Sequence, residues 1–475
     1  MAFDPPPSAP EPAPLDRLSL SAKLAFGAGD MGAGMTSNLI AFSFLIFLTE
    51  VAGLQPLAAG TVLLIGKIWD AVNDPIVGYL SDRTQSRWGR RYPWMFLGAV
   101  PFGATFLLMW LVPGFLGSTG KFWYYVFAAV LFQVFFTVVN LPYTTLTAEL
   151  TQDYDERTEL TAYRLASSVF GAIAALGLGL VTSLLIADPR QQYLVLGGLC
   201  ALLSVLPVFW CIWGTFPHAQ RRLQQIGDAE DPATELPFME QLKIALTNRA
   251  FLFVVGIYLF AWLALQITAS IIPFYATSWM GLDTYFVAAL LVQGTAIAMM
   301  FVVNRISRRV GKQNAFYIGM SFWLVAQIAL FFIQPGQTGI FYGFCVVASL
   351  GVATAYVIPW AMLPDVIELD ELQTGQRREG IFYSFMTLLQ KIGLAGGLFL
   401  VGLALEVSGF ISEATEQTAS ALLAIRTFMG PIPLVLLLCA IGLAYYYPIT
   451  RVIHDDIRLK LAENKRQSVD INEPR

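Results

Sequence analysis

Twelve long apolar stretches, separated by short polar segments, limit the fold of this chain more than any other feature. A helix needs about 20 apolar residues to cross the hydrocarbon core of a bilayer, and each stretch is long enough to do so. Lipid offers the backbone no hydrogen-bonding partner, so such segments cross as helices. With 56% hydrophobic and 13% charged residues, the sequence predicts an all-α integral membrane protein. The predicted spans are 24–50, 57–80, 93–114, 122–148, 160–187, 191–215, 250–279, 284–304, 314–334, 338–364, 381–408 and 424–448.

The longest polar segment between spans, residues 216–249, divides the chain into two sets of six. The predicted parts are a Pro-rich, disordered N-terminal tail (1–22), a first half (23–215), this central loop, a second half (250–448) and a C-terminal tail (449–475). The N-terminal tail lacks the apolar core of a signal peptide, so we expect it to stay attached. The second part of the central loop is a candidate for lying along the membrane surface.

Basic residues gather in the loops on one side of the predicted spans. Because Lys and Arg are enriched in cytoplasmic loops, we expect both termini and the central loop in the cytoplasm of a multi-pass protein of the cell membrane. The basic side carries Arg83, Arg87, Arg90, Arg91, Arg221, Arg222, Arg305, Arg308, Arg309, Lys312, Arg377 and Arg378, and the other side chiefly Lys121, Arg190 and Arg426.

The two halves resemble each other at one place. The segment GYLSDRTQSRWGRR follows the second span of the first half, and NRISRRVGKQ follows the second span of the second half. Six spans repeated in this way predict the major facilitator superfamily fold of two six-helix halves, with the substrate between them at mid-membrane. General enrichment of positive charge in cytoplasmic loops is the alternative explanation.

Charges inside the second span give the strongest functional signal. Lys67, Asp70 and Asp74 fall at helical spacings of three and four, so they share one face, and Asn73 lies at its edge. A charge at the bilayer centre costs about 3 kcal/mol or more, so these side chains need a partner, a watery cavity or a bound ion. Oxygen ligands suit sodium, and a proton is the other candidate. A structural ion pair with Lys67 is the alternative, although two acids against one base leave a negative excess.

Other spans contribute polar candidates. Thr137, Asn140 and Thr144 surround Pro142, whose missing N–H frees a carbonyl within the membrane; a simple kink is the alternative. Arg164 and Lys391 lack an acid on their own helix face and are expected to find a partner across the bundle, although Arg164 lies near enough to a span end to snorkel. Lys391 is a candidate partner of the span-two aspartates or of an anionic or hydroxylated substrate. The substrate-binding or gating candidates are Lys67, Asn140, Thr144, Arg164, Tyr356, Trp360 and Lys391.

A charged segment follows span ten, after Pro359 and Pro364. Its acids and bases are candidates for a cytoplasmic latch that forms and breaks as the halves rock, and a solvated run of charges is the alternative. The candidate latch residues are Asp82, Arg83, Arg90, Asp365, Arg377 and Arg378.

The sequence gives little support to other classes of function. Its four cysteines fall within apolar spans, as small packing residues do, and its two histidines lie outside the spans. It contains no nucleophile elbow, phosphate loop or zinc spacing, so we expect neither an enzyme nor a cofactor. Nucleic acid is not an expected partner. Membrane lipid and a small-molecule substrate are the expected partners, and a monomer is sufficient for the expected mechanism.

The segment KIWDAVNDPIVGYLSDRTQSRWGRRYPW resembles the glycoside-pentoside-hexuronide cation symporters, the melibiose permease group of the major facilitator superfamily. KLAFGAGD, NLPYTTL, AYR, PWAMLPDVIELDE, TGQRREGIFYSF and LLQK extend the likeness across nearly the whole chain. The resemblance implies a cation site of Asp70, Asn73, Asp74 and Thr137, with Arg164 and Lys391 lining or gating the cavity.

The same resemblance fails at two positions. The carboxylates that hold the sugar in that family, on spans one and four, fall here on Gly34 and Asn140. NLPYTTLTAEL, AYVIPWAMLPDVIE and YYYPI also look like the sodium-dependent lysophosphatidylcholine symporters. We therefore expect a symporter driven by sodium or protons that works by alternating access, with a sugar or glycoside as substrate and a lysophospholipid as the alternative.

Overall fold

The computed structural model describes residues 18–151, 153–226, 238–376, 378–412, 414 and 416–472, and every regular element in them is helical. Most of the expected N-terminal tail and part of the central loop lie outside these residues. The first half contains α1 (Leu20–Ala28), α2 (Met31–Leu39), η1 (Ile40–Phe44), η2 (Phe47–Val51), α3 (Pro56–Asp82), α4 (Tyr92–Met109), α5 (Ser118–Leu150), α6 (Tyr154–Leu185) and α7 (Pro189–Ile226). The rest contains α8 (Phe238–Thr247), α9 (Arg249–Phe274), η3 (Tyr275–Trp279), α10 (Phe286–Val310), α11 (Lys312–Phe332), α12 (Thr338–Thr374), α13 (Glu379–Val407), α14 (Ala419–Met429), α15 (Pro431–Tyr445) and α16 (Arg451–Asn472).

Among the described residues, ten helical segments are long and apolar enough to cross a membrane. The other two expected spans differ from them in ways the sequence explains. The segment 20–51 is broken at Gly29 and Asp30 and continues as two π-helical turns, whereas α3 carries the charges Lys67, Asp70 and Asp74. Both lie where spans one and two are expected. Neither segment counts as a long apolar helix, because the first is broken into short pieces and α3 carries several charges.

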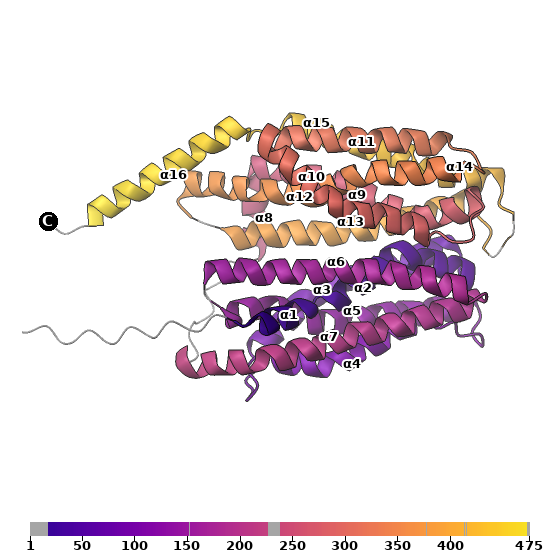
Figure 1. The fold of residues 1–475 in the computed structure, drawn as a ribbon, viewed down its shortest axis with the longest axis horizontal. Helices are drawn as coiled ribbons and strands as arrows, with labels where there is room; N and C mark the ends of the chain where they lie inside the picture. The colour runs from indigo at the N-terminus through magenta and orange to yellow at the C-terminus, as the bar shows by residue number, and fades with distance from the viewer. Residues whose placement is uncertain are drawn as a thin grey trace, which may run out of the picture.

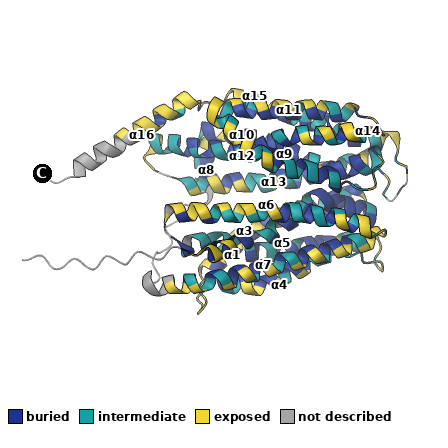
Figure 2. Cartoon of the chain, viewed as in Figure 1, coloured by how far each residue is buried: buried dark blue, intermediate teal, exposed yellow. Residues whose placement is uncertain are grey.

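The two halves lie side by side with their helices roughly parallel to one direction (Figure 1). The first half occupies the lower part of the view and the second half the upper part, and between them α13 packs on α3 and α10 packs on α6. Large apolar side chains are exposed on the outer helices, including Leu184, Trp213 and Phe301 (Figure 2). A bilayer would cover such a surface, because water would not tolerate apolar patches of this extent.

The first spanning segment of each half ends in the same way. A π-helical turn is followed by a glycine with a left-handed backbone, Gly53 (φ 71°) in one half and Gly281 (φ 67°) in the other. The main-chain N–H that follows each glycine donates 2.9 Å back to the sixth preceding carbonyl, from Leu54 to Leu48 and from Leu282 to Ala276. This matched ending is a second internal repeat that the sequence analysis did not identify.

Hydrogen bonds join the halves at one end of the bundle. We call the end at which α3 and α10 finish, which carries residues 83–91 and 305–311, the basic end, and the other the opposite end. At the opposite end Ser183 bonds Thr284 (3.3 Å), and the buried Tyr193 bonds Tyr285 (3.1 Å). The main-chain N–H of Leu57 also donates to Glu406 there. Each of these bonds joins one half to the other, so the structure is closed at the opposite end.

Both ends of the described chain contain more order than expected. Leu18 is buried and its N–H donates 2.7 Å to Glu156, so part of the predicted N-terminal tail (18–22) is fixed. The segment expected as a C-terminal tail contains α16, which packs on α12 and extends away from the bundle (Figure 1). His454 of α16 bonds Glu368 at 2.9 Å. The second part of the central loop forms α8, which packs against α9 and α13.

Candidate functional site

The acidic pair of α3 is gathered with a lysine from the other half. Asp70 is almost completely buried, with 2% of its side chain exposed, whereas Asp74 retains 35%. The ammonium of Lys391, on α13, lies 2.5 Å from Asp74 Oδ2 and 3.1 Å from Asp70 Oδ2. Lys67 lies 3.6 Å from the same oxygen of Asp70. One ammonium from the second half therefore binds both carboxylates of the first.

A hydroxyl from α5 completes this group. Thr137 Oγ1 donates to Asp74 Oδ1 at 3.0 Å and lies 3.4 Å from Asp70 Oδ1. Thr137 is 2% exposed, so its hydroxyl has little access to water and is held on the carboxylates. Lys391 and Thr137 thus approach the acids on different oxygens. The group brings carboxylate oxygens and a hydroxyl oxygen together, and these are the ligand types that hard cations prefer.

Glycines set the spacing of the helices that carry these residues. A Cβ built on Gly66 of α3 would lie 3.3 Å from Ala129 Cβ of α5, so these two helices pack tightly. A Cβ on Gly402 of α13 would lie 2.5 Å from the carbonyl oxygen of Pro56. The same Cβ would lie 3.1 Å from Gly60 Cα of α3; ten residues separate Gly60 from Asp70 and eleven separate Gly402 from Lys391, so each lies about 15 Å along its helix toward the basic end. The close crossing therefore brings the acid and the ammonium to the same depth.

The formal charges of the group cancel. Asp70 and Asp74 contribute two negative charges, and Lys67 and Lys391 contribute two positive ones. Considered alone, span two predicts a negative excess, and the structure supplies the missing charge from α13. Buried charges are tolerated when they are paired in this way, because the pairing offsets their loss of hydration.

Two predicted residues near this group have other surroundings. The side-chain N–H of Asn73, expected beside the cation, donates to the main-chain oxygen of Gln133 at 3.4 Å. The structure therefore gives Asn73 a bond between α3 and α5. Asn140, one turn beyond Thr137 on α5, has a buried Oδ1 without a hydrogen-bond partner among the described residues.

Arg164 of α6 has Asp30 as its acidic neighbour. Asp30 stands at the break between α1 and α2, where it experiences the charge of Arg164 and lies near Ser168. The structure thus places an acid of the first half near Arg164, while the buried Nε of Arg164 has no hydrogen-bond partner among the described residues. At Gly34, one turn further along α2, a Cβ would collide with the main-chain oxygen of Ser168. No side chain fits there in this conformation, which explains physically why a carboxylate is missing.

Aromatic rings form a wall in the second half. Trp262 packs against Tyr258 and Tyr356, with ring centroids 5.6 Å apart in each pair. Trp360 lies 5.8 Å from Tyr258 and 6.2 Å from Tyr383. Tyr356 and Trp360 are predicted substrate or gating residues. The sequence analysis did not select the other three rings of this group, Tyr258, Trp262 and Tyr383. Their spacing on α9 and α13 carries no sequence signal that separates them from ordinary packing residues.

At the basic end, each ion pair that the structure shows for the described residues of the candidate latch joins two residues of the same half. Arg378 binds Asp370 at 2.6 Å, and Asp365 binds Lys312, also at 2.6 Å. In the first half, Arg91 pairs with Asp82 and lies 3.4 Å from Glu149, and Arg90 lies 3.2 Å from the same Glu149. Arg83 lies over the Tyr79 ring. Arg377 lies outside the described residues. The sequence analysis thus selected charged residues of this end but did not identify their partners Lys312, Asp370, Arg91 and Glu149.

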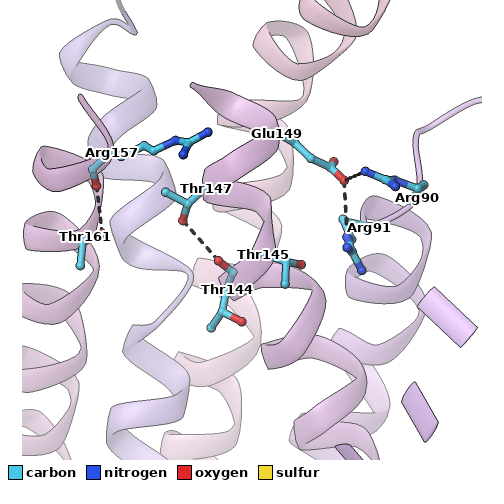
Figure 3. A pocket seen from close by; sticks show the side chains of 8 residues that line it. All are labelled: Arg90, Arg91, Thr144, Thr145, Thr147, Glu149, Arg157 and Thr161. Atoms are coloured by element: carbon cyan, nitrogen blue, oxygen red, sulfur yellow. Dashed lines mark hydrogen bonds and ion pairs between the residues drawn. The ribbon is translucent and has the colours of Figure 1, made fainter. Parts of the chain in front are cut away.

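Thr144, predicted as a substrate or gating residue, lies away from the acidic pair. It donates to the main-chain oxygen of Leu141 at 2.9 Å and lines a cavity of about 480 Å³ at the basic end. Figure 3 shows this cavity with Arg90, Arg91 and Arg157 around it.

Comparison with known proteins gives a consistent result. The family model described as MFS/sugar transport protein matches residues 25–451. An uncharacterized symporter of Synechocystis sp. is 42% identical, over 95% of this chain and 98% of its own. Sodium-dependent lysophosphatidylcholine symporter 1 of Gallus gallus is 27% identical, over 96% of this chain and 90% of its own.

Solved structures share the fold. The E. coli xylose transporter XylE, in a partially occluded inward-open conformation, superposes with a TM-score of 0.61 at 12% identity, covering 91% of this chain and 98% of its own. The nucleoside transporter NupG superposes with a TM-score of 0.58 at 16% identity, covering 90% and 97%.

Proposed function

The chain belongs to the MFS/sugar transport protein family and is a cation-coupled symporter, and on this premise we propose that sodium or a proton is bound by Asp70, Asp74 and Thr137. The observation that carries this proposal is the position of the Lys391 ammonium, 2.5 and 3.1 Å from the two carboxylates. A positive group already occupies the place where the oxygens converge. A cation that arrived there would replace one positive charge by another.

Coupling follows from this exchange. When the cation binds, Lys391 leaves the acids, and the site stays neutral because Lys67 remains beside Asp70. The released ammonium, on α13, becomes available to the substrate or to other groups in the cavity. Because α3 and α13 belong to different halves, breaking their ion pairs changes how firmly the halves are held together at this depth.

For the substrate we favour a sugar or glycoside. The family description supports this choice, and so does the aromatic wall of Tyr356 and Trp360, since rings with polar edges suit hydroxylated ligands. A lysophospholipid is the second candidate. It is supported by the avian relative and by the occupation of the expected sugar-binding carboxylate positions by Gly34 and Asn140.

We further propose that the basic end faces the cytoplasm of a cell-membrane protein whose termini are both cytoplasmic. The gathered arginines support this orientation through the positive-inside rule. In that orientation the structure is closed toward the outside, and the cation would leave toward the cytoplasm. We also propose that the protein transports as a monomer without catalysis or a resident cofactor.

The direct test replaces each acid. In proteoliposomes, Asp70→Cys and Asp74→Cys are each expected to abolish uptake driven by a sodium or proton gradient while the protein remains folded and inserted. Asp283→Asn, an acid in an exposed loop of the opposite end, serves as the control and should transport normally. Full sodium- and proton-driven uptake by both cysteine variants would refute the proposed cation site.

A thermal-stability screen of the purified protein identifies the substrate class. Sugars and lysolipids are each added with and without sodium, since a ligand that binds only the folded state raises its stability. We expect a larger shift when a true substrate and its coupling ion are present together. A sugar that stabilises only with sodium would support the leading proposal, and a lysolipid that does so would replace it.

A further inference from the structure

The cavity at the basic end of the first half has an unusual charge balance. It lies where α4 begins, α5 ends and α6 begins, and three arginines line it together with one acid, Glu149. Four threonines supply the remaining lining (Figure 3). The lining therefore carries a formal charge of +2, or +1 when Asp82, which pairs with Arg91, is included. None of its residues takes part in the acidic pair or contacts Lys391.

The single acid is already shared by two of the arginines. Glu149 Oε1 lies 3.2 Å from Arg90 and 3.4 Å from Arg91. Arg91 is also fixed by Ser81, at 2.8 Å, and by Asp82, and only 9% of its side chain is exposed. One wall of the cavity is thus a positioned guanidinium that side chains of α3 and α5 hold in place. Such a group loses little conformational entropy when it binds a ligand.

Arg157 forms the other positive wall. Its Nε donates to the main-chain oxygen of Thr151 at 2.8 Å, and Figure 3 shows its guanidinium reaching toward Thr147. Among the described residues it has no carboxylate within ion-pair distance. A fixed carbonyl thus orients this guanidinium while its charge remains unneutralised. Arginine in this state is well suited to bind an oxyanion through two N–H groups at once.

The threonines add hydroxyls that can change partner. Thr147 donates to the main-chain oxygen of Thr144 at 3.3 Å, a long bond whose loss costs little. Thr161 donates to the main-chain oxygen of Arg157 at 2.9 Å. Rotation of either hydroxyl would direct its hydrogen into the cavity. The lining therefore combines charged donors with adjustable neutral ones.

We propose that this cavity is a binding site for a phosphate group. Guanidinium groups match the geometry of phosphate oxygens, and the net positive charge requires an anion. At about 480 Å³ the space exceeds what one phosphate fills, so the group is borne by a small ester or by a lipid headgroup. Its occupancy ties α4, α5 and α6 together at the basic end. This site is separate from the cation site and does not depend on the proposed substrate.

The first experiment measures thermal stability of the purified full chain against inorganic phosphate, with chloride at equal ionic strength as the reference. Wild-type protein should show a saturable stabilisation by phosphate. Arg157→Gln should weaken the apparent affinity at least tenfold, and Arg157→Lys should recover part of it, because an ammonium keeps the charge but loses the bidentate geometry. Arg309→Gln, an exposed arginine at the same end outside the cavity, should behave as wild type.

The second experiment distinguishes the source of the phosphate. Native mass spectrometry counts lipids retained by protein taken from nanodiscs of phosphatidylglycerol or of phosphatidylcholine, for wild type and Arg157→Gln. Loss of one retained lipid in the variant identifies a headgroup, whereas equal retention with a phosphate response identifies a soluble ester. The Arg157→Gln and Arg157→Lys proteins must be monodisperse, with secondary structure like that of wild type. If wild type and Arg157→Gln respond equally to phosphate and retain equal lipid, the proposal is overturned.

Discussion

Lys391 is the residue on which the site depends. Among the residues that the structure describes, it alone brings charge from the second half to the acids of the first, at 2.5 and 3.1 Å. A permanent structural ion pair and an exchangeable one make opposite predictions when this ammonium is removed. In the first case the buried acids lose a needed partner, and in the second a competitor of the cation disappears.

Lys391→Gln is therefore expected to bind the coupling cation about tenfold more tightly, since about 1.4 kcal/mol of competition would be removed. Coupled uptake should nevertheless be lost, because no ammonium is left to be released from the acids when the cation binds. Isothermal titration with sodium, and with protons by pH jump, measures the affinity. Weaker binding of both ions, with uptake intact, would show that Lys391 has only a structural role.

Thr137→Val removes a neutral oxygen and keeps the shape of the side chain. We expect the cation concentration for half-maximal uptake to rise about tenfold, the effect of losing roughly 1 to 1.5 kcal/mol of ligand interaction. Thr137→Ser should stay close to wild type. Thr105→Val on α4 serves as the control, because Thr105 is equally buried but bonds only to its own helix. Equal effects of the two valine variants would contradict a ligand role for Thr137.

At the scale of the element, α13 connects the opposite end of the bundle to the acidic pair. Gly402 allows it to cross α3 closely, and the helix then carries Lys391 to the depth of Asp70. Helices are stiff over this distance, so a change at the crossing moves the ammonium. The position of the site is thus controlled by a residue that does not touch it.

Gly402→Ala and Gly396→Ala test this on the same helix. A Cβ at Gly402 would lie 2.5 Å from Pro56 O, whereas one at Gly396 meets nothing within 4 Å. Overpacking of this kind costs about 1 to 3 kcal/mol, so Gly402→Ala should reduce uptake at least tenfold while Gly396→Ala transports normally. Initial uptake rates in proteoliposomes that contain equal amounts of protein distinguish the two variants. Equal uptake rates would show that α3 and α13 can move apart at Gly402 without loss of transport.

At the scale of the whole molecule, hydrogen bonds join the halves at the opposite end, whereas the ion pairs between described residues of the basic end lie within each half. Tyr193 and Tyr285 are both buried and bond each other at 3.1 Å across the two halves. Alternating access requires such contacts to open as others close. Their strength sets how much of the population has this conformation.

Tyr193→Phe, Tyr285→Phe and the double variant should each weaken the closed opposite end by about 1 kcal/mol, roughly a fivefold change in population. A cysteine at Thr144, in the basic-end cavity, reports this change through its rate of labelling by a membrane-impermeant maleimide from the basic side. Labelling should slow by a similar factor in all three, because the two hydroxyls make one bond. Additive effects in the double variant would show that they act separately.

The sequence by itself determined the class of fold and the main acidic residues. Apolar length and the placement of arginines predict helices that cross a bilayer in two halves, and Asp70 and Asp74 within such a helix need a partner, a watery cavity or a bound ion. These conclusions follow from local composition and periodicity.

Only the tertiary structure decided which partner each charge has. The distance between Lys391 and Asp74, the choice of Asp370 for Arg378, and the unneutralised Arg157 all depend on how helices distant in sequence cross. Glycine contacts such as that of Gly402 with Pro56 set those crossings. Periodicity tells which face a side chain occupies, but it does not give the depth or identity of the opposing helix. For this physical reason the sequence could single out the acids and offer Lys391 as one candidate partner, but it could not decide which charges pair.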